Sequence, residues 1–139
     1  MQISHFLKNR FGLRFNPDNE ILITVGVSEG LDLVMRAIVN PGDKILIPEP
    51  CYVSYGAVTT LAGGIPVYIS TEKTRFKLKA QDIDRYYDKK TKAIIFNYPA
   101  NPTGVSYTKR ELEEIKKAIL RHNLIVISDE VYDELTYDY

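Results

Sequence analysis

Short runs of branched aliphatic residues alternate along this chain with longer segments whose apolar residues recur at helical spacing. This alternation limits the folds that the chain can adopt, because the runs predict strands and the longer segments predict helices. The predicted strands are residues 21–25, 44–47, 65–69, 93–96 and 124–127, and the predicted helices are residues 3–11, 28–39, 52–62, 78–87 and the segment after Thr108. Strands that alternate with helices form a parallel sheet covered on both faces. The sequence therefore predicts an α/β fold with three layers, α-β-α, around a mostly parallel sheet.

The length and composition are those of one folded domain. The chain has 139 residues, of which 45% are apolar and 26% charged, which is enough for a hydrophobic core. The 18 basic side chains are balanced by 18 acidic ones, so the composition indicates neither a nucleic-acid partner nor a membrane partner. Cys51 is the single cysteine, which excludes an internal disulfide and a cysteine-based zinc site. No metal site is predicted.

The function is expected at one edge of the sheet. Right-handed crossovers place the carboxyl ends of parallel strands at the same edge, and ligands of open α/β sheets bind there. The first predicted strand leads into residues 26–30, a turn of small residues before a helix. Free backbone N–H groups and the helix dipole favour an anion at such a place. Ser28 could add a hydroxyl to an anion site, or it could only cap the helix.

Two further loops at this edge carry aromatic and amide side chains. In residues 48–52, two prolines stiffen the loop that presents Tyr52. This tyrosine could stack on a planar ligand, or it could belong to the core. Residues 97–104 combine two asparagines with two prolines, which would hold polar groups in place; the alternative is a generic turn.

An acidic residue follows the last predicted strand. Asp129 comes soon after the apolar run 125–127, and a buried carboxylate needs a partner. A cationic ring nitrogen would be such a partner, although Asp129 could also cap a helix. Tyr132 would lie on the same side as Asp129 if a helical turn begins there. One helix and one strand separate Asn101 from Asp129, so the loops are predicted to converge on one site.

These motifs together resemble those of a known family. The sequence NPTG at residues 101–104, followed by SDEVY at residues 128–132, resembles the class I/II aminotransferases of the type I pyridoxal-phosphate fold. The similarity is greatest to their aspartate, aromatic and alanine aminotransferase branch. It covers nearly the whole chain, and it includes residues 24–31 and 40–55. The resemblance implies that pyridoxal 5'-phosphate is the cofactor.

The resemblance also implies a role for two loops at the start of the site. Val27 and Ser28 would hold the cofactor phosphate at the N-terminus of a helix. Tyr52 would stack on the pyridine ring.

Three more residues would bind the polar atoms of the ring. By the same resemblance, Asn101 and Tyr132 would both hydrogen-bond its phenolic oxygen. Asp129 would pair with the protonated ring nitrogen. A carboxylate at that nitrogen keeps the ring cationic, and a cationic ring is an electron sink.

The resemblance further implies what surrounds these residues. Residues 1–139 would be part of the cofactor-binding large domain of an aminotransferase, which transfers an amino group between an amino acid and a 2-oxo acid in amino acid metabolism. The family's small domain, its N-terminal arm and its Schiff-base lysine are expected to lie outside this chain. No catalytic residue is therefore assigned in it, and the chain alone is expected to be inactive. The family also implies a homodimer in the cytoplasm.

Two alternative functions remain open from the sequence. The chain could be a non-catalytic fragment that binds a phosphorylated ligand or a partner protein. In that case, replacing Asp129 should leave ligand binding unchanged. It could also belong to a pyridoxal-phosphate-dependent lyase of the same fold, because related lyases share these motifs.

Overall fold

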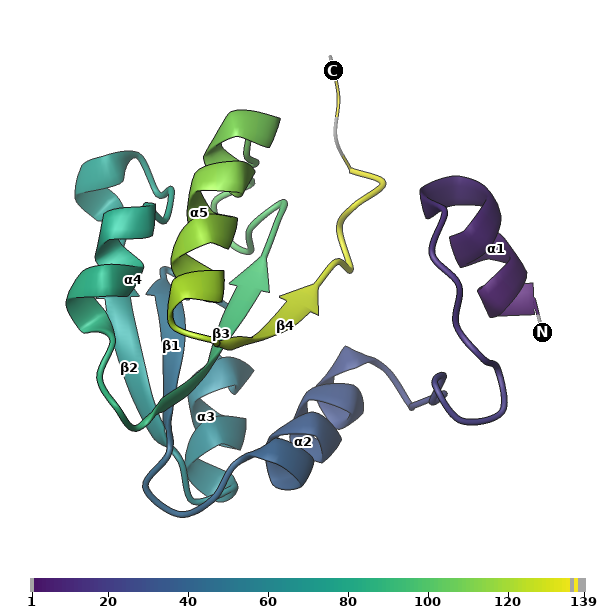
Figure 1. The fold of residues 1–139 in the computed structure, drawn as a ribbon, viewed down its shortest axis with the longest axis horizontal. Helices are drawn as coiled ribbons and strands as arrows, with labels where there is room; N and C mark the ends of the chain where they lie inside the picture. Colours follow the sequence, from purple (N-terminus) through teal and green to yellow (C-terminus); the bar gives the residue numbers. More distant parts are fainter. Residues whose placement is uncertain (1, 136, 138–139) are drawn as a thin grey trace.

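A parallel sheet forms the centre of the computed structural model (Figure 1). The structure describes residues 2–135 and 137. In this part of the chain, four strands lie in the spatial order β2-β1-β3-β4, and each neighbouring pair is parallel. They are β1 (Lys44–Glu49), β2 (Ile65–Ser70), β3 (Thr91–Asn97) and β4 (Ile125–Asp129). Four of the predicted strands are therefore confirmed, with ends that differ by at most two residues.

Helices cover both faces of the sheet, as the alternating pattern predicts. The helices of the described residues are α1 (Gln2–Phe11), α2 (Val27–Ile38), α3 (Ser54–Leu61), α4 (Ala80–Tyr86), α5 (Lys109–Arg121) and the short 3-10 helix η1 (Glu72–Thr74). Figure 1 shows α2 and α3 on one side of the sheet and α4 and α5 on the other. None of the described helices is long and apolar enough to cross a membrane.

Two hydrophobic cores fill the space between the sheet and its two helical layers. Successive side chains of a strand point to opposite faces, and β1 divides its residues in this way. Ile45 and Ile47 pack with Leu31 of α2 and Val58 of α3. Leu46, between them, packs on the other face with residues of α4 and α5. Because both faces are covered, β1 and β3 are buried along most of their length.

The prediction of a strand at residues 21–25 is wrong for this structure. These residues form no strand, and three of their apolar side chains lie largely in solvent: Leu22 is 73% exposed, Ile23 72% and Val25 91%. Branched aliphatic residues favour strands when they can pack against neighbouring strands. None of the four strands of the described residues pairs with this segment, so it has no neighbouring strand to pack against.

Candidate functional site

The carboxyl edge of the sheet and the N-terminus of α2 surround a cavity of about 200 Å³. This volume is many times the roughly 10–15 Å³ that a cavity needs to hold one water molecule. The cavity is lined by Val27, Ser28, Tyr52, Tyr55, Asn101, Asp129, Val131 and Tyr132. All six residues that the sequence assigned to a binding site are in this set. The predicted convergence of the loops is therefore confirmed, while the role of each residue stays a prediction.

The first turn of α2 presents backbone N–H groups to this cavity. Gly26 precedes the helix with a φ of 82°, a backbone conformation that glycine adopts at little cost. The helix begins at Val27 and Gly26 is its N-cap, so Ser28 lies inside the first turn and does not cap it. The carboxylate of Glu29 accepts a hydrogen bond from the N–H of Val25. The free N–H groups of a first helical turn favour an anion.

Two tyrosines form one wall of the cavity. Tyr52 follows β1, and its hydroxyl lies 3.3 Å from the Oγ of Ser28. This hydrogen bond with Ser28 lowers the pKa of Tyr52. The ring of Tyr55, in the first turn of α3, packs edge-to-face against that of Tyr52, with 5.7 Å between the ring centres. The two rings therefore hold each other beside the N-terminus of α2.

Asp129 is the buried acid of the site. It ends β4 and is only 8% exposed. Its Oδ2 accepts a hydrogen bond of 2.7 Å from the hydroxyl of Tyr55, and its Oδ1 lies 3.3 Å from the N–H of Val131. Residues 131–134 form turns and no helix, so Asp129 is not a helix cap. Within the described part of the chain, Asp129 forms no ion pair.

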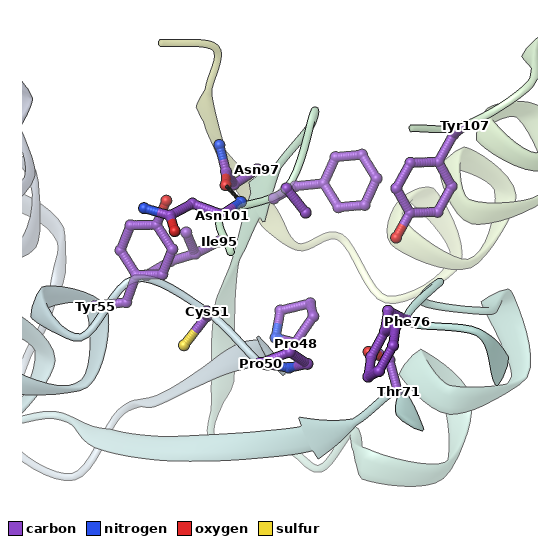
Figure 2. A pocket seen from close by; sticks show the side chains of 12 residues that line it. Pro48, Pro50, Cys51, Tyr55, Thr71, Phe76, Ile95, Asn97, Asn101 and Tyr107 are labelled. Atoms are coloured by element: carbon purple, nitrogen blue, oxygen red, sulfur yellow. Dashed lines mark hydrogen bonds between the residues drawn. The ribbon is translucent and has the colours of Figure 1, made fainter. Parts of the chain in front are cut away.

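Asn97 joins the two loops that follow β3 and β4. It ends β3, where it lies in register with Asp129 on β4. Its side-chain amide donates to the backbone carbonyl of Asp129 at 2.8 Å and accepts from the N–H of Asn101 at 2.8 Å. Figure 2 shows the second of these bonds as a dashed line. The amide of Asn101 in turn lies 3.4 Å from the hydroxyl of Tyr132, which places both side chains on the same cavity.

A smaller cavity of about 20 Å³ adjoins the site, with room for about one water molecule. Tyr55 and Asn101 line both cavities. Figure 2 shows these two side chains together with Cys51, which follows β1, Thr71, which follows β2, and other lining residues. Burial raises the pKa of the Cys51 thiol, which keeps it in its less reactive protonated form.

Sequence reasoning missed two residues that shape the site, Tyr55 and Asn97. Tyr55 follows Tyr52 by three residues, and in the helix predicted at residues 52–62 this spacing would place both on one side; that spacing was the available signal. Asn97 was visible only as part of a loop, and its contacts follow from the register of β3 and β4.

The arrangement suits a flat ligand with an anion at one end and a basic ring nitrogen. Backbone N–H groups of α2 and the hydroxyl of Ser28 can bind an anion. The ring of Tyr52 offers a surface for stacking. The carboxylate of Asp129 can accept a hydrogen bond from a cation, because a carboxylate has about four acceptor positions and two neighbouring groups use only part of them.

Comparisons with known proteins show relatives of this chain. The model of the family described as aminotransferase class I and II matches residues 1–139. The Bacillus subtilis protein YugH is 51% identical over 138 residues, which are 99% of this chain and 36% of that protein. An aspartate aminotransferase of Pyrococcus abyssi is 41% identical over 98% of this chain and 35% of its own length.

Solved structures show the same similarity. The crystal structure of an aromatic aminotransferase from Pyrococcus horikoshii OT3 matches with a TM-score of 0.93 and 41% identity, over 98% of this chain and 37% of that one. An aspartate aminotransferase of Thermus thermophilus, solved with maleate, matches with a TM-score of 0.91 and 32% identity, over 99% of this chain and 36% of that one. The chain thus spans about a third of the length of these relatives.

Proposed function

The chain belongs to the class I and II aminotransferase family, and on that premise we propose that its cavity binds pyridoxal 5'-phosphate. The reaction would be the transfer of an amino group between an amino acid and a 2-oxo acid. Residues 1–139 would form part of the cofactor-binding domain of such an enzyme. The observation that carries the proposal is Asp129, a carboxylate that is 8% exposed and that accepts hydrogen bonds from a phenol and a backbone N–H. Burying such a group is favourable only when a partner offsets its lost hydration.

The residues at the N-terminus of α2 and after β1 would hold the cofactor in place. The N–H groups of Val27 and Ser28, with the hydroxyl of Ser28, would bind the phosphate at the N-terminus of α2. Tyr52 would orient the ring by stacking on it. These contacts would fix the position of the cofactor without taking part in the chemistry.

The polar residues across the cavity would act on the ring itself. Asn101 and Tyr132 would bind its phenolic oxygen. Asp129 would hold a proton on the ring nitrogen, because a carboxylate favours a positive charge beside it. The chemistry that the bound cofactor supplies is that of an electron sink for the carbanion of the substrate.

The test is an equilibrium titration of the chain with pyridoxal phosphate. The variant Asp129→Asn keeps the shape of the side chain and removes its charge. We expect it to bind the cofactor at least about tenfold more weakly, since hydrogen bonds to charged groups contribute roughly 1.5–3 kcal/mol. Glu130→Gln is the matched control, because Glu130 is the next residue, is exposed and does not line this cavity.

The outcome separates this function from the non-catalytic alternative. If Asp129→Asn binds pyridoxal phosphate as tightly as the wild type, and inorganic phosphate competes equally well in both, the site recognises only a phosphate. That result would overturn the role of Asp129 in binding the ring.

The family also supports two broader proposals. We propose that the enzyme acts as a homodimer, and that it works in the cytoplasm. The exposed apolar side chains of β4, Ile125 and Val126, support association, because apolar edge strands tend to pair. The single cysteine is consistent with a reducing compartment.

A further inference from the structure

We propose that Tyr55 is a positioning residue, which fixes the direction in which the carboxylate of Asp129 faces the cavity. The inference rests on the proposed function, because Asp129 is the residue that would hold the proton on the ring nitrogen. It adds a residue that the motifs of the sequence do not identify.

The phenol and the carboxylate come from elements far apart in the chain. Tyr55 lies in α3 and Asp129 at the end of β4, and the hydroxyl of Tyr55 donates to Oδ2 of Asp129 at 2.7 Å. Tyr55 is 2% exposed and packs in the core with Leu31, Met35 and Ile95. A ring packed among core residues has little freedom to turn. The position of its hydroxyl is therefore fixed by the fold.

The protonated phenol of Tyr55 is the donor in this hydrogen bond. Burial raises the pKa of Tyr55, and the hydrogen bond with Asp129 raises it further. The raised pKa favours the protonated phenol, which can donate to the carboxylate and carries no charge that would repel it. A neutral donor can hold an acid in place while leaving its negative charge available to a cation.

The two oxygens of Asp129 are held unequally. Oδ2 has the short bond from Tyr55, whereas Oδ1 has only the 3.3 Å contact with the N–H of Val131. A bond of 2.7 Å lies at the most frequent length for O–H···O bonds, and 3.3 Å is beyond the usual range for N–H···O. Tyr55 therefore makes the stronger bond to the carboxylate and determines its orientation. Oδ1 is left as the oxygen with more capacity for a further donor.

The same residue also touches the stacking wall of the cavity. The edge of one ring meets the face of the other between Tyr55 and Tyr52, at an angle of 84°. The variant Tyr55→Phe would keep this ring contact and remove only the hydroxyl. It therefore tests the bond to Asp129 separately from the packing of the ring.

The first measurement concerns the chain without cofactor. A double-mutant cycle of Tyr55→Phe and Asp129→Ala, followed by urea unfolding, measures the coupling between the two side chains. We expect the hydrogen bond to change the unfolding equilibrium constant by about tenfold or more, because its acceptor is charged. A coupling factor near one would overturn the proposal, since the bond would then hold nothing in place.

The second measurement detects the proton on the ring nitrogen. Pyridoxamine phosphate, labelled at this nitrogen, is added to the chain, and nitrogen NMR distinguishes the protonated from the unprotonated ring. In the wild type we expect the protonated signal. In Tyr55→Phe we expect a shift toward the unprotonated signal, because a carboxylate that has lost its donor competes for the ring proton or turns away from it.

A matched control separates positioning from stability. In Tyr107→Phe, a partly buried phenol is lost, one that accepts from the N–H of Leu78 at 2.9 Å and lies outside the larger cavity. This variant should keep the wild-type signal. If the ligand binds to Tyr55→Phe and gives the same nitrogen signal as in the wild type, the proposal is overturned.

Failure of the proposed function gives a different result. If the wild-type chain does not bind the labelled probe, the proposed function and the positioning role both fail. A coupling of about tenfold in the unfolding cycle would then describe a structural hydrogen bond only.

Discussion

Polar side chains around the cavity are held by residues from other elements of the fold. Asn97 of β3 bonds to the backbone of Asp129 at the end of β4, and Tyr55 of α3 bonds to the side chain of the same acid. The hydroxyl of Ser28, in α2, meets that of Tyr52 after β1. Because every partner comes from a different element, the geometry of the site depends on the assembled sheet.

Gly64 illustrates how closely the residues around the sheet are packed. A Cβ at this position would lie 2.9 Å from Cγ1 of Val39 and 3.1 Å from Cγ2 of Thr59. We expect Gly64→Ala to lower the free energy of unfolding by about 1–3 kcal/mol, as overpacking of a core does. Urea denaturation would measure this loss.

Gly30 provides the control for this substitution. Its added Cβ would meet only the Oγ1 of Thr24, at an ordinary 3.5 Å. It lies inside α2, where alanine is favoured over glycine by up to about 1 kcal/mol. Gly30→Ala should therefore be neutral or stabilising. Equal stability of Gly64→Ala and the wild type would contradict the close packing around Gly64.

At the scale of residues, the sequence predicted the groups that would face a ligand. Asn101, Asp129 and Tyr132 stand in recognisable motifs, and they line one cavity as predicted. Tyr55 and Asn97 could not be assigned in the same way, because they act on other protein groups. Their partners are set by strand register and by the packing of α3, which local sequence does not specify.

Single elements were predictable where the signal was local. Thr108 and Glu111 form a capping box, a pattern of a threonine followed three residues later by a glutamate that marks the start of a helix, and α5 begins at Lys109, the residue after Thr108. The strand predicted at residues 21–25 failed for the opposite reason. A strand needs a neighbour for its hydrogen bonds, and the sequence of this segment carries no information about whether one is present.

The start of α5 should make stability depend on pH through Glu111. Lys77 donates to the Glu111 carboxylate at 2.9 and 3.0 Å and lowers its pKa from 4.5 to about 2. A lowered pKa means that ionised Glu111 stabilises the folded state above pH 4.5. This stabilisation is lost as the pH falls from 4.5 toward 2.

The variant Glu111→Gln tests this dependence. It should be less stable than the wild type at neutral pH, and thermal unfolding should show the difference shrinking as the pH falls from 4.5 toward 2. Glu113→Gln is the control, because the side chain of Glu113 is more exposed and pairs with Lys116 at 3.7 Å, a longer distance than that between Lys77 and Glu111. A difference that stays constant over this pH range would exclude Glu111 as the cause.

On the scale of the whole molecule, apolar surface gathers around the β4 edge and α2. Ile125 and Val126 of β4 are 42% and 43% exposed, and Leu33 and Val34 of α2 are about equally exposed. A groove between α2 and β4 is lined in part by Val34 and Ile127. Exposed apolar surface of this kind favours association, and self-association of the chain stays a prediction.

The most direct test of the proposed cofactor site is to map where the cofactor binds on the whole chain. Amide NMR during a titration with pyridoxamine phosphate would follow every backbone N–H at once. If the cofactor binds in the proposed cavity, the signals that move will belong to the N-terminus of α2, to Tyr52, to Asn101 and to residues 129–132. Signals that do not move, or changes confined to the opposite edge of the sheet around Lys44 and Asp88, would contradict binding in this cavity.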